Sequence, residues 1–168
     1  MDLETFANIA EIAGALTIVG GAIFGSMQLL EIRRQRSAQV AADVMRTFMI
    51  PELTDAIALL RKLPDGVSAE ELRREGPHAE KAAILVCMTF ETLGLMAFKR
   101  VAPFNLVLEL AGGITCVMWR KLGPWMEQIR IEQSQPSWAE WFQWLAIQCE
   151  QKKFSQDPAH IRHVNWIR

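Results

Sequence analysis

The stretch Ile12–Leu30 reads IAGALTIVGGAIFGSMQLL, nineteen residues without a charged side chain. As a helix rising about 1.5 Å per residue it would be roughly 28 Å long, close to the thickness of a bilayer's hydrocarbon core. Acids alone supply the charges before it, and three arginines follow it, Arg33, Arg34 and Arg36. Because basic residues favour the cytoplasmic side, this pattern predicts a single transmembrane helix in an inner or plasma membrane. The N-terminus would lie outside and the bulk of the chain in the cytoplasm.

Two other interpretations of this stretch fit its residues less well. A cleavable signal peptide has a basic start and an apolar core of about 7–15 residues, whereas this start is acidic and the core is longer. A helix of a soluble domain is expected to show a polar face, and this stretch is apolar all round. We therefore expect residues 1–32 to form a retained anchor with a short outer flank.

Small side chains recur every four residues within the expected anchor. The four positions are Ala13, Thr17, Gly21 and Gly25. A stripe of small residues lets a second helix approach closely in lipid, and Gly21-x-x-x-Gly25 is its most compact part. The alternative is that the glycines reflect only how common glycine is in membrane helices. We expect the stripe to pack against another membrane protein or a second copy of this chain.

The 168 residues leave room for one compact domain after the anchor. The formal net charge is −1, but every lysine and arginine lies at or after Arg33. The cytoplasmic part therefore holds eighteen basic against fifteen acidic residues, a net +3. This balance suits a nearby anionic leaflet and is too weak for nucleic-acid binding, which a strongly basic stripe would indicate. We expect anionic lipid at the inner leaflet as a partner and no nucleic acid.

Helical spacing of apolar residues continues after the anchor, and no alternating strand pattern appears. It predicts an all-α fold, with a small cytoplasmic helical bundle over residues 33–154 and a polar tail over 155–168. A capping box begins at Ser68, Gly112-Gly113 reads as a hinge or cap, and Gly123-Pro124 is expected to kink its helix. The expected helices cover residues 35–50, 52–63, 68–74, 78–100, 104–110, 114–133 and 138–154.

A second apolar stretch, Ala82–Phe98, contains one charged residue, Glu91. The stretch is short for a membrane pass, and a carboxylate in the middle of such a helix is costly in lipid. A second pass would also carry the basic residues that follow, Lys99 and Arg100, to the outer side. We expect this stretch to be a central buried helix of the cytoplasmic bundle, with a second membrane segment as the alternative.

Glu91 itself is a candidate for chemistry. A buried carboxylate must be paired, hydrogen-bonded or protonated. We expect a buried ion pair with Arg120 or Arg130, because an arginine fork matches a carboxylate. The alternative is a role as general acid, general base or ligand.

All six tryptophans fall in the last fifty residues. Trp138, Trp141 and Trp144 recur every three residues and would spread over part of one helix face. Core packing is the common explanation for such a cluster, but Trp is also favoured in protein interfaces and at the headgroup level of membranes. Trp166 stands apart in the tail and is the best single candidate for an exposed contact. These four residues are our candidates for a partner interface.

Cys87, Cys116 and Cys149 are widely spaced, and each lies in an apolar helical context. They are expected to be buried thiols in a reducing compartment. No spacing of cysteine and histidine suggests zinc, and nothing nearby completes a metal site around His160 and His163. We expect no metal and no cofactor.

Several motifs follow one another in an order that is familiar from one protein family. They are Thr89-Phe90-Glu91-Thr92-Leu93-Gly94, Gly112-Gly113, Trp119-Arg120-Lys121-Leu122, Pro124-Trp125, Ile129-Arg130 and the segment from Trp138 to Leu145. Over most of Arg33–Ile147 the chain resembles the uncharacterised DUF4760 family. The resemblance implies an N-terminal membrane helix, a basic juxtamembrane segment and a helical domain with a Phe-Glu pair on its central helix. It singles out Phe90, Glu91, Trp119 and Arg130 and implies no activity.

Common catalytic motifs are missing, including a phosphate-binding loop, a nucleophile elbow and HExxH. Arg73 and His78 have the spacing used by HEPN-type ribonucleases, but Gly76-Pro77 lies between them, so one continuous helix cannot carry both. We therefore expect a non-catalytic interaction or accessory subunit of a membrane-associated complex. The alternatives are a membrane-tethered enzyme, such as a HEPN-like nuclease effector, and a lipid-facing structural protein.

Overall fold

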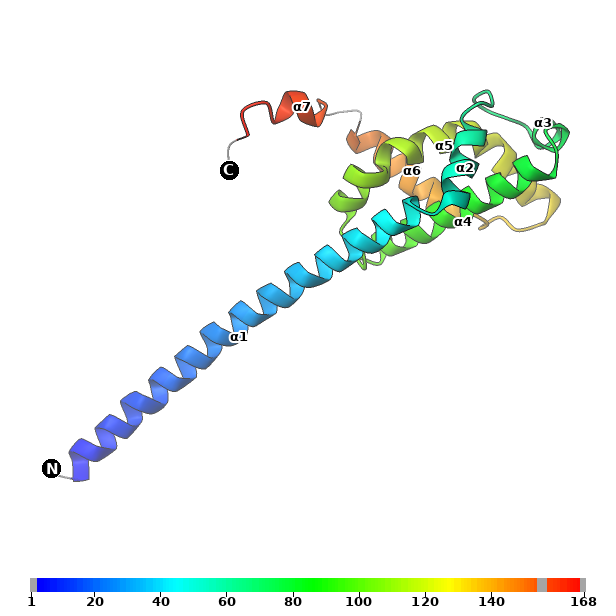
Figure 1. Ribbon diagram of the computed structural model, residues 1–168. Coiled ribbons are helices and arrows are strands. Elements are labelled where there is room, and N and C mark those ends of the chain that lie inside the picture. Colours follow the sequence, from blue (N-terminus) through cyan, green and yellow to red (C-terminus); the bar gives the residue numbers. More distant parts are fainter. Residues whose placement is uncertain (1–2, 154–156, 167–168) are drawn as a thin grey trace. The chain divides into compact units, whose positions relative to one another are not determined.

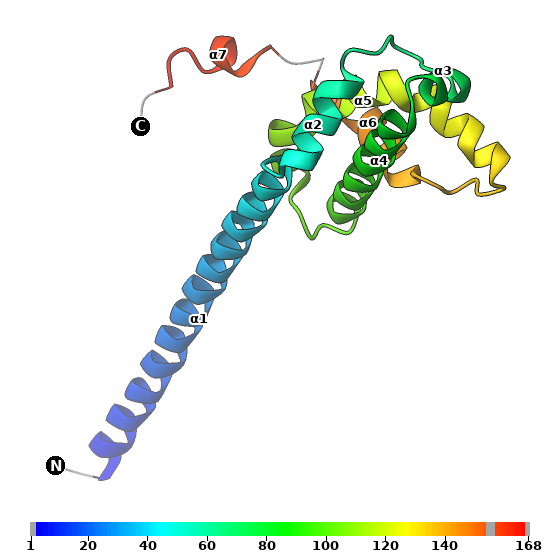
Figure 2. The same cartoon turned by 45° about the vertical axis from the view of Figure 1, so that its right-hand side comes forward.

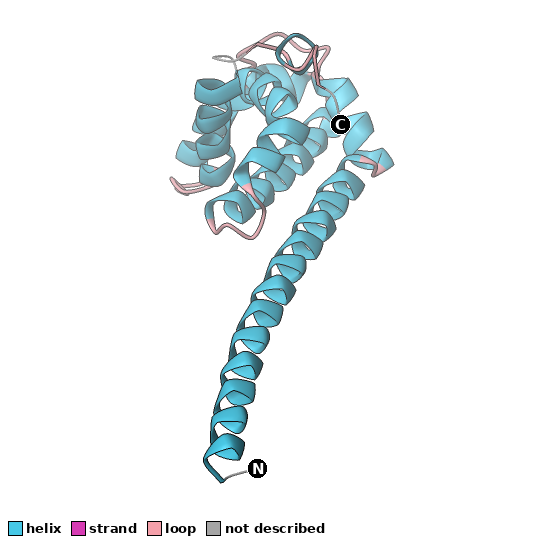
Figure 3. Ribbon diagram, turned by 90° about the vertical axis from the view of Figure 1, so that its left-hand side faces the viewer, coloured by secondary structure: helices cyan, strands magenta, loops and turns pink. Residues whose placement is uncertain are grey.

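The computed structural model of the chain describes residues 3–153 and 157–166. These residues form helices and contain no strand (Figure 1, Figure 3). The helices are α1 (Leu3–Phe48), α2 (Pro51–Leu60), α3 (Ala69–Arg74), α4 (Pro77–Phe98), α5 (Phe104–Glu132), α6 (Glu140–Lys153) and α7 (Ala159–Arg162). The predicted all-α fold is confirmed.

The chain divides into two units, residues 1–39 and residues 40–168. The first unit is made of the larger part of α1, which continues unbroken because neither proline nor a glycine pair interrupts it after Leu30. Its large apolar side chains from Ile12 to Ile32 are between 47% and 74% exposed. A surface of this kind is expected to be covered by another apolar phase.

Two described helices are long and apolar enough to cross a membrane, over Gly14–Phe48 and over Pro77–Phe98. They differ in how much of the apolar stretch the fold already covers. None of it is buried in the first helix, whereas 44% is buried in the second. A buried core helix has this second property, because its apolar face contacts its own domain instead of lipid.

Helix α4 packs against α2, α5 and α6 within the second unit (Figure 2). Its buried positions recur at intervals of three and four residues, as one face of a helix requires. They are Ala79, Ala82, Ala83, Val86, Cys87, Phe90, Leu93, Gly94 and Ala97. The ring of Phe90 is fully buried and lies 5.9 Å from Phe48 of α1 and 5.1 Å from Phe142 of α6. The aromatic rings of three helices thus meet on this face of α4.

Helix α6 comes very close to α4 at Gly94. A Cβ atom at this position would lie 2.2 Å from the carbonyl oxygen of Trp141 and 2.7 Å from its carbonyl carbon. No side chain is compatible with that distance, so only glycine allows the two helices to be this close. One helical turn earlier on α4 stands Glu91, which also contacts the start of α6.

Helix α5 differs from the prediction at its glycines. Residues 104–110 and 114–133 were expected to be separate helices with a hinge or cap at Gly112-Gly113, but α5 runs through both glycines from Phe104 to Glu132. The prediction of a break is wrong because Gly112 lies buried in the packed helix, and packing outweighs a propensity cost of about 1 kcal/mol per glycine.

Pro124 also lies inside α5, and a neighbouring loop compensates for it. Proline has no N–H, so the carbonyl of Arg120, four residues earlier, loses its usual helical donor. The backbone N–H of Gly66 donates to that carbonyl at 2.8 Å, and the N–H of Val67 donates to the carbonyl of Lys121 at 2.9 Å. The loop between α2 and α3 is therefore fixed to α5 where the proline frees a backbone acceptor.

Helix α3 begins as the sequence predicts. The Ser68 side chain accepts from the backbone N–H of Glu71, and the Glu71 carboxylate accepts from the backbone N–H of Ser68. The next boundary falls at Gly76, whose φ of 98° favours glycine, and α4 starts at Pro77. Arg73 and His78 consequently belong to different helices, as expected.

Candidate functional site

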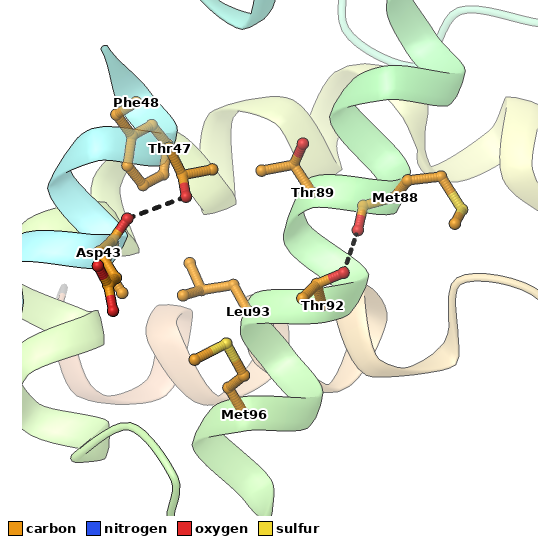
Figure 4. A pocket seen from close by; sticks show the side chains of 9 residues that line it. Asp43, Thr47, Phe48, Met88, Thr89, Thr92, Leu93 and Met96 are labelled. Atoms are coloured by element: carbon orange, nitrogen blue, oxygen red, sulfur yellow. Dashed lines mark hydrogen bonds between the residues drawn. The ribbon is translucent and has the colours of Figure 1, made fainter. Parts of the chain in front are cut away.

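A cavity of about 340 Å³ lies in the second unit, between the last turns of α1 and the middle of α4 (Figure 4). From α1 it is lined by Asp43, Val44, Thr47 and Phe48, and from α4 by Met88, Thr89, Thr92, Leu93 and Met96. Its volume falls within the range of about 300–1,000 Å³ that is typical of ligand pockets. We refer to it as the α1/α4 cavity.

Three of the residues that line the α1/α4 cavity are threonines, but their hydroxyl groups bond to their own helices. Thr47 donates to the carbonyl of Asp43 at 3.0 Å and Thr92 to that of Met88 at 2.9 Å (Figure 4). Thr89 donates to the carbonyl of Leu85 at 2.8 Å. Each hydroxyl thus has an acceptor one turn earlier in its helix. The remaining lining is aliphatic, aromatic or thioether, apart from Asp43.

Methionine makes this lining adaptable. Met88 and Met96 lie two turns apart on α4, and Met88 is 53% exposed. The unbranched thioether side chain changes rotamer easily and can follow ligands of irregular shape. Phe48 lies against the buried ring of Phe90, so the floor of the cavity is fixed while its opening can adjust.

The charges of the α1/α4 cavity lie at its opening. Asp43 is the one ionisable residue among those that line it, and its carboxylate lies 3.4 Å from Nη1 of Arg46. Both side chains are largely exposed, at 65% and 79%. Water and salt screen such a pair, so it contributes little to stability. It does place one negative and one positive group at the entrance.

A second cavity, of about 510 Å³, adjoins the first at Met88 and lies between α4 and the loop from Ser134 to Ala139. Glu91 lines it and binds the start of α6: the backbone N–H of Phe142 donates to Oε2 of Glu91 at 2.9 Å, and the N–H of Trp141 also bonds to the carboxylate. These N–H groups belong to the first turn of α6, where no helical acceptor exists. Glu91 therefore caps α6 from a different helix.

Burial raises the pKa of Glu91 above its ordinary value, and the two backbone donors oppose that rise only in part. The charge of Glu140 raises the pKa further, and that of Arg130 lowers it. Desolvation also raises the pKa of the Cys87 thiol, one turn earlier on α4, so this cysteine stays protonated and unreactive.

The predicted ion pair between Glu91 and an arginine is wrong, because the carboxylate binds backbone N–H groups of α6 instead. Among the described residues neither arginine forms an ion pair with Glu91. Arg120 lies 3.7 Å from Asp65, while Arg130 donates from Nε to the carbonyl of Trp138 and from Nη1 to Oε1 of Gln143, each at 2.7 Å. The backbone of α6 competes better for the carboxylate, because its first N–H groups would otherwise lack acceptors.

The tryptophans of α6 and its entry loop are packed against other rings. Trp138 lies 5.5 Å from Trp125, and Trp141 and Trp144 lie 4.5 and 5.6 Å from Phe98. All three retain some exposed surface, since none is fully buried. Trp166 differs from them, with 70% of its surface exposed.

The candidate residues of the anchor lie on α1 in the first unit. Around Gly21 and Gly25 no described atom lies within 4 Å of an added Cβ, so this side of the helix is open. Thr17 and the three arginines at 33, 34 and 36 are exposed, and the side chain of Ala13 lies outside the described part of the chain.

The residues proposed for nuclease chemistry do not form a site. Arg73 pairs with Glu132 of α5, and His78 lies at the start of α4, on a different helix from Arg73. Within residues 3–153 and 157–166, no group of three or more His, Cys, Asp or Glu side chains could hold a metal ion. The three cysteines are buried free thiols, as predicted.

The α1/α4 cavity was missed at the sequence level. Its signal was Thr89 and Thr92 with Met88 and Met96, a short run of threonine and methionine on one side of an apolar helix. That pattern marks a face of α4 that is neither fully apolar nor charged. Which residues lie opposite it depends on where the end of α1 packs, and periodicity alone does not give that.

Comparison with known proteins gives one match. No curated protein and no solved structure matches the chain. One family model matches residues 12–149, and its description is "Domain of unknown function (DUF4760)". Because the match covers most of the sequence, the chain belongs to the DUF4760 family.

Proposed function

We propose that this protein is a single-pass, membrane-anchored binding protein that acts as a non-catalytic accessory subunit of a membrane-associated complex. The observation that carries the proposal is the uncovered apolar surface of α1 between Ile12 and Ile32. Side chains such as Leu16, Ile18 and Phe24 lie on different sides of α1 and are 63–74% exposed. In water such an exposed apolar helix would promote aggregation, whereas in lipid it is stable.

The charge pattern supports an orientation for this anchor. Arg33, Arg34 and Arg36 follow the apolar stretch and are exposed, while the residues before it carry only acids. This asymmetry favours an outer N-terminus and a cytoplasmic helical domain. The same arginines are suited to anionic lipid headgroups at the inner leaflet.

A single pass is favoured over two because α4 already has a protein environment. It packs against α2, α3, α5 and α6, and its Glu91 caps α6. Extracting α4 into lipid would expose these core residues and leave the first turn of α6 without its acceptor.

Binding is favoured over catalysis because three charged residues of the second unit, Glu91, Arg130 and Arg73, make structural bonds. Glu91 and Arg130 hold the start of α6, and Arg73 holds α5 to α3. What remains for recognition are the α1/α4 cavity, the partly exposed rings of Trp141 and Trp144, and the exposed Trp166.

The test is purification of the tagged full-length chain in mild detergent, followed by mass spectrometry and native sizing. The proposal predicts a stoichiometric companion or a defined homo-oligomer that Gly21→Ile or Gly25→Ile disrupts. Gly20→Ile is the matched control, because it adds the same side chain about 100° away around the same helix. Equal loss of the companion or of the homo-oligomer in all three variants would contradict packing through the small-residue stripe.

The proposal fails if the purified chain shows robust turnover that Glu91→Gln or His78→Ala abolishes. Growth toxicity relieved by changing Arg73 or His78, with the fold intact, would favour the nuclease alternative. Loss of membrane affinity after replacement of Trp166 alone would instead favour the lipid-facing structural alternative.

A further inference from the structure

We infer that the α1/α4 cavity binds one acyl chain of a zwitterionic phospholipid, so that the helical domain holds a membrane lipid as its ligand. The inference rests on the proposed function, because it takes the lipid from the bilayer in which α1 is anchored. The cavity lies wholly in the second unit, and the inference needs no fixed arrangement of the two units.

The lining matches a flexible hydrocarbon chain. The three threonine hydroxyls donate to carbonyls of their own helices, so they offer a ligand only acceptor lone pairs, as does the Asp43 carboxylate. The lining therefore has no unused side-chain donor for a polar ligand, whereas burial of methylene groups is favourable. At roughly 30 Å³ for a group the size of a water molecule, 340 Å³ holds about ten such groups, a large part of one acyl chain.

The lipid source lies within reach of the cavity. Asp43 is only seven residues beyond Arg36, the last arginine of the juxtamembrane cluster. Even a fully extended chain would span at most about 25 Å over seven residues. Whatever the orientation of the domain, its cavity stays close to the membrane surface, where phospholipid is far more concentrated than any free apolar molecule.

The charges at the entrance select the headgroup. Asp43 lines the opening, and Arg46 lies 3.4 Å from its carboxylate. A zwitterionic headgroup carries an ammonium group that complements Asp43 and a phosphate that complements Arg46. A purely anionic headgroup would complement Arg46 but meet the negative charge of Asp43. Since both side chains are exposed, they set a preference between headgroups and contribute little to affinity.

The test uses the full-length chain in vesicles containing phosphatidylethanolamine with a diazirine at the end of one acyl chain. After irradiation, mass spectrometry maps the adducts. Adducts within residues 12–32 report insertion of the anchor and thus test the proposed function. Adducts on Phe48, Met88, Leu93 or Met96 report occupancy of the cavity. We expect both sets, and an equal amount of phosphatidylglycerol bearing the same diazirine should give fewer cavity adducts.

Thr92→Trp fills the cavity from an exposed position and should lower cavity adducts about tenfold while leaving anchor adducts unchanged. Thr92→Glu should do the same by placing a charge in the apolar lining. Ile84→Trp is the matched control, since it lies exposed on α4 outside the lining and should have no effect. Thermal melts followed by circular dichroism verify that each variant is folded. Asp43→Asn should raise the share of phosphatidylglycerol adducts.

Anchor adducts without cavity adducts in the wild-type chain would overturn the inference and leave the proposed anchor intact. Cavity adducts that both Thr92 variants leave unchanged would also overturn it. Absence of any adduct over residues 12–32 would contradict the anchor itself.

Discussion

At the scale of single residues, Gly94 and Glu91 together determine how α6 meets α4. Glu91 binds two backbone N–H groups of the first turn of α6, and Gly94 leaves space for the carbonyl of Trp141. Both act on the main chain of α6 and not on its side chains. Their spacing of three residues places them on one side of α4.

Gly94→Ala should destabilise the fold by about 3 kcal/mol or more. The new Cβ would lie 2.2 Å from a backbone oxygen, which cannot move without displacing α6. Gly113→Ala is the control, because nothing lies within 4 Å of its Cβ in α5, and it should gain about 0.5–1 kcal/mol from helix propensity. Chemical unfolding of the full-length chain in detergent measures both. Similar losses for the two variants would contradict the close approach.

Replacing Glu91 should change how stability depends on pH. Its pKa is raised in the folded chain, so the folded state holds the proton more tightly than the unfolded state, and this group's contribution to stability falls as the pH rises above about 4.5. Glu91→Gln cannot ionise but keeps an oxygen for the N–H of Phe142. Its stability relative to wild type should therefore increase as the pH rises from 4.5 to 7.5. Glu91→Ala lacks the acceptor, and its free energy of unfolding should be lower by about 1 kcal/mol at either pH. A constant difference between wild type and Glu91→Gln would contradict the raised pKa.

At the scale of elements, α5 shows how one helix tolerates two features that usually end helices. Gly112 is buried against other helices, and the acceptor freed by Pro124 is taken by the loop before α3. That loop is held further by Lys121, whose ammonium group donates to the carbonyl of Leu63 and lies 3.2 Å from Asp65. The proline thus provides a hydrogen-bond acceptor for the loop, and α5 continues past it.

Pro124→Ala should therefore loosen the loop without weakening α5. The substitution would return a backbone N–H to the carbonyl of Arg120, and this donor then competes with the N–H of Gly66 for the same acceptor. Hydrogen exchange should become faster at Gly66 and Val67, by about tenfold if roughly 1.4 kcal/mol of local protection is lost. Amides of α3 provide the internal control. Unchanged protection at Gly66 would show that the loop is held by Lys121 instead.

The sequence predicts where a helix begins or ends when residues adjacent in sequence determine that boundary. The capping box at Ser68 and the break at Gly76-Pro77 depend on residues adjacent in sequence, and both are confirmed. The partner of Glu91, the continuity of α5 through Gly112-Gly113 and the α1/α4 cavity depend on contacts between distant segments. Those contacts decide which of several allowed local structures is adopted, and a single sequence carries little information about them.

At the scale of the whole molecule, one chain combines two kinds of surface. The first unit is a helix whose apolar side chains are uncovered, and the second unit buries a core of its own around α4. A protein of this composition is stable if the first surface meets lipid and the second domain stays in water. The proposed topology therefore requires one crossing of the membrane, made by α1 and not by α4.

The most direct test of that claim is the topology of the full-length chain in a bacterial inner membrane. Glu4→Cys and Gln151→Cys place single reactive thiols before the apolar stretch of α1 and on the exposed side of α6, while the native Cys87, Cys116 and Cys149 are buried. Spheroplasts are treated with a membrane-impermeant maleimide, before and after lysis. We predict labelling of residue 4 in intact spheroplasts and of residue 151 only after lysis. Labelling of both before lysis, or of neither, would place the two residues on the same side of the membrane and would contradict a single crossing.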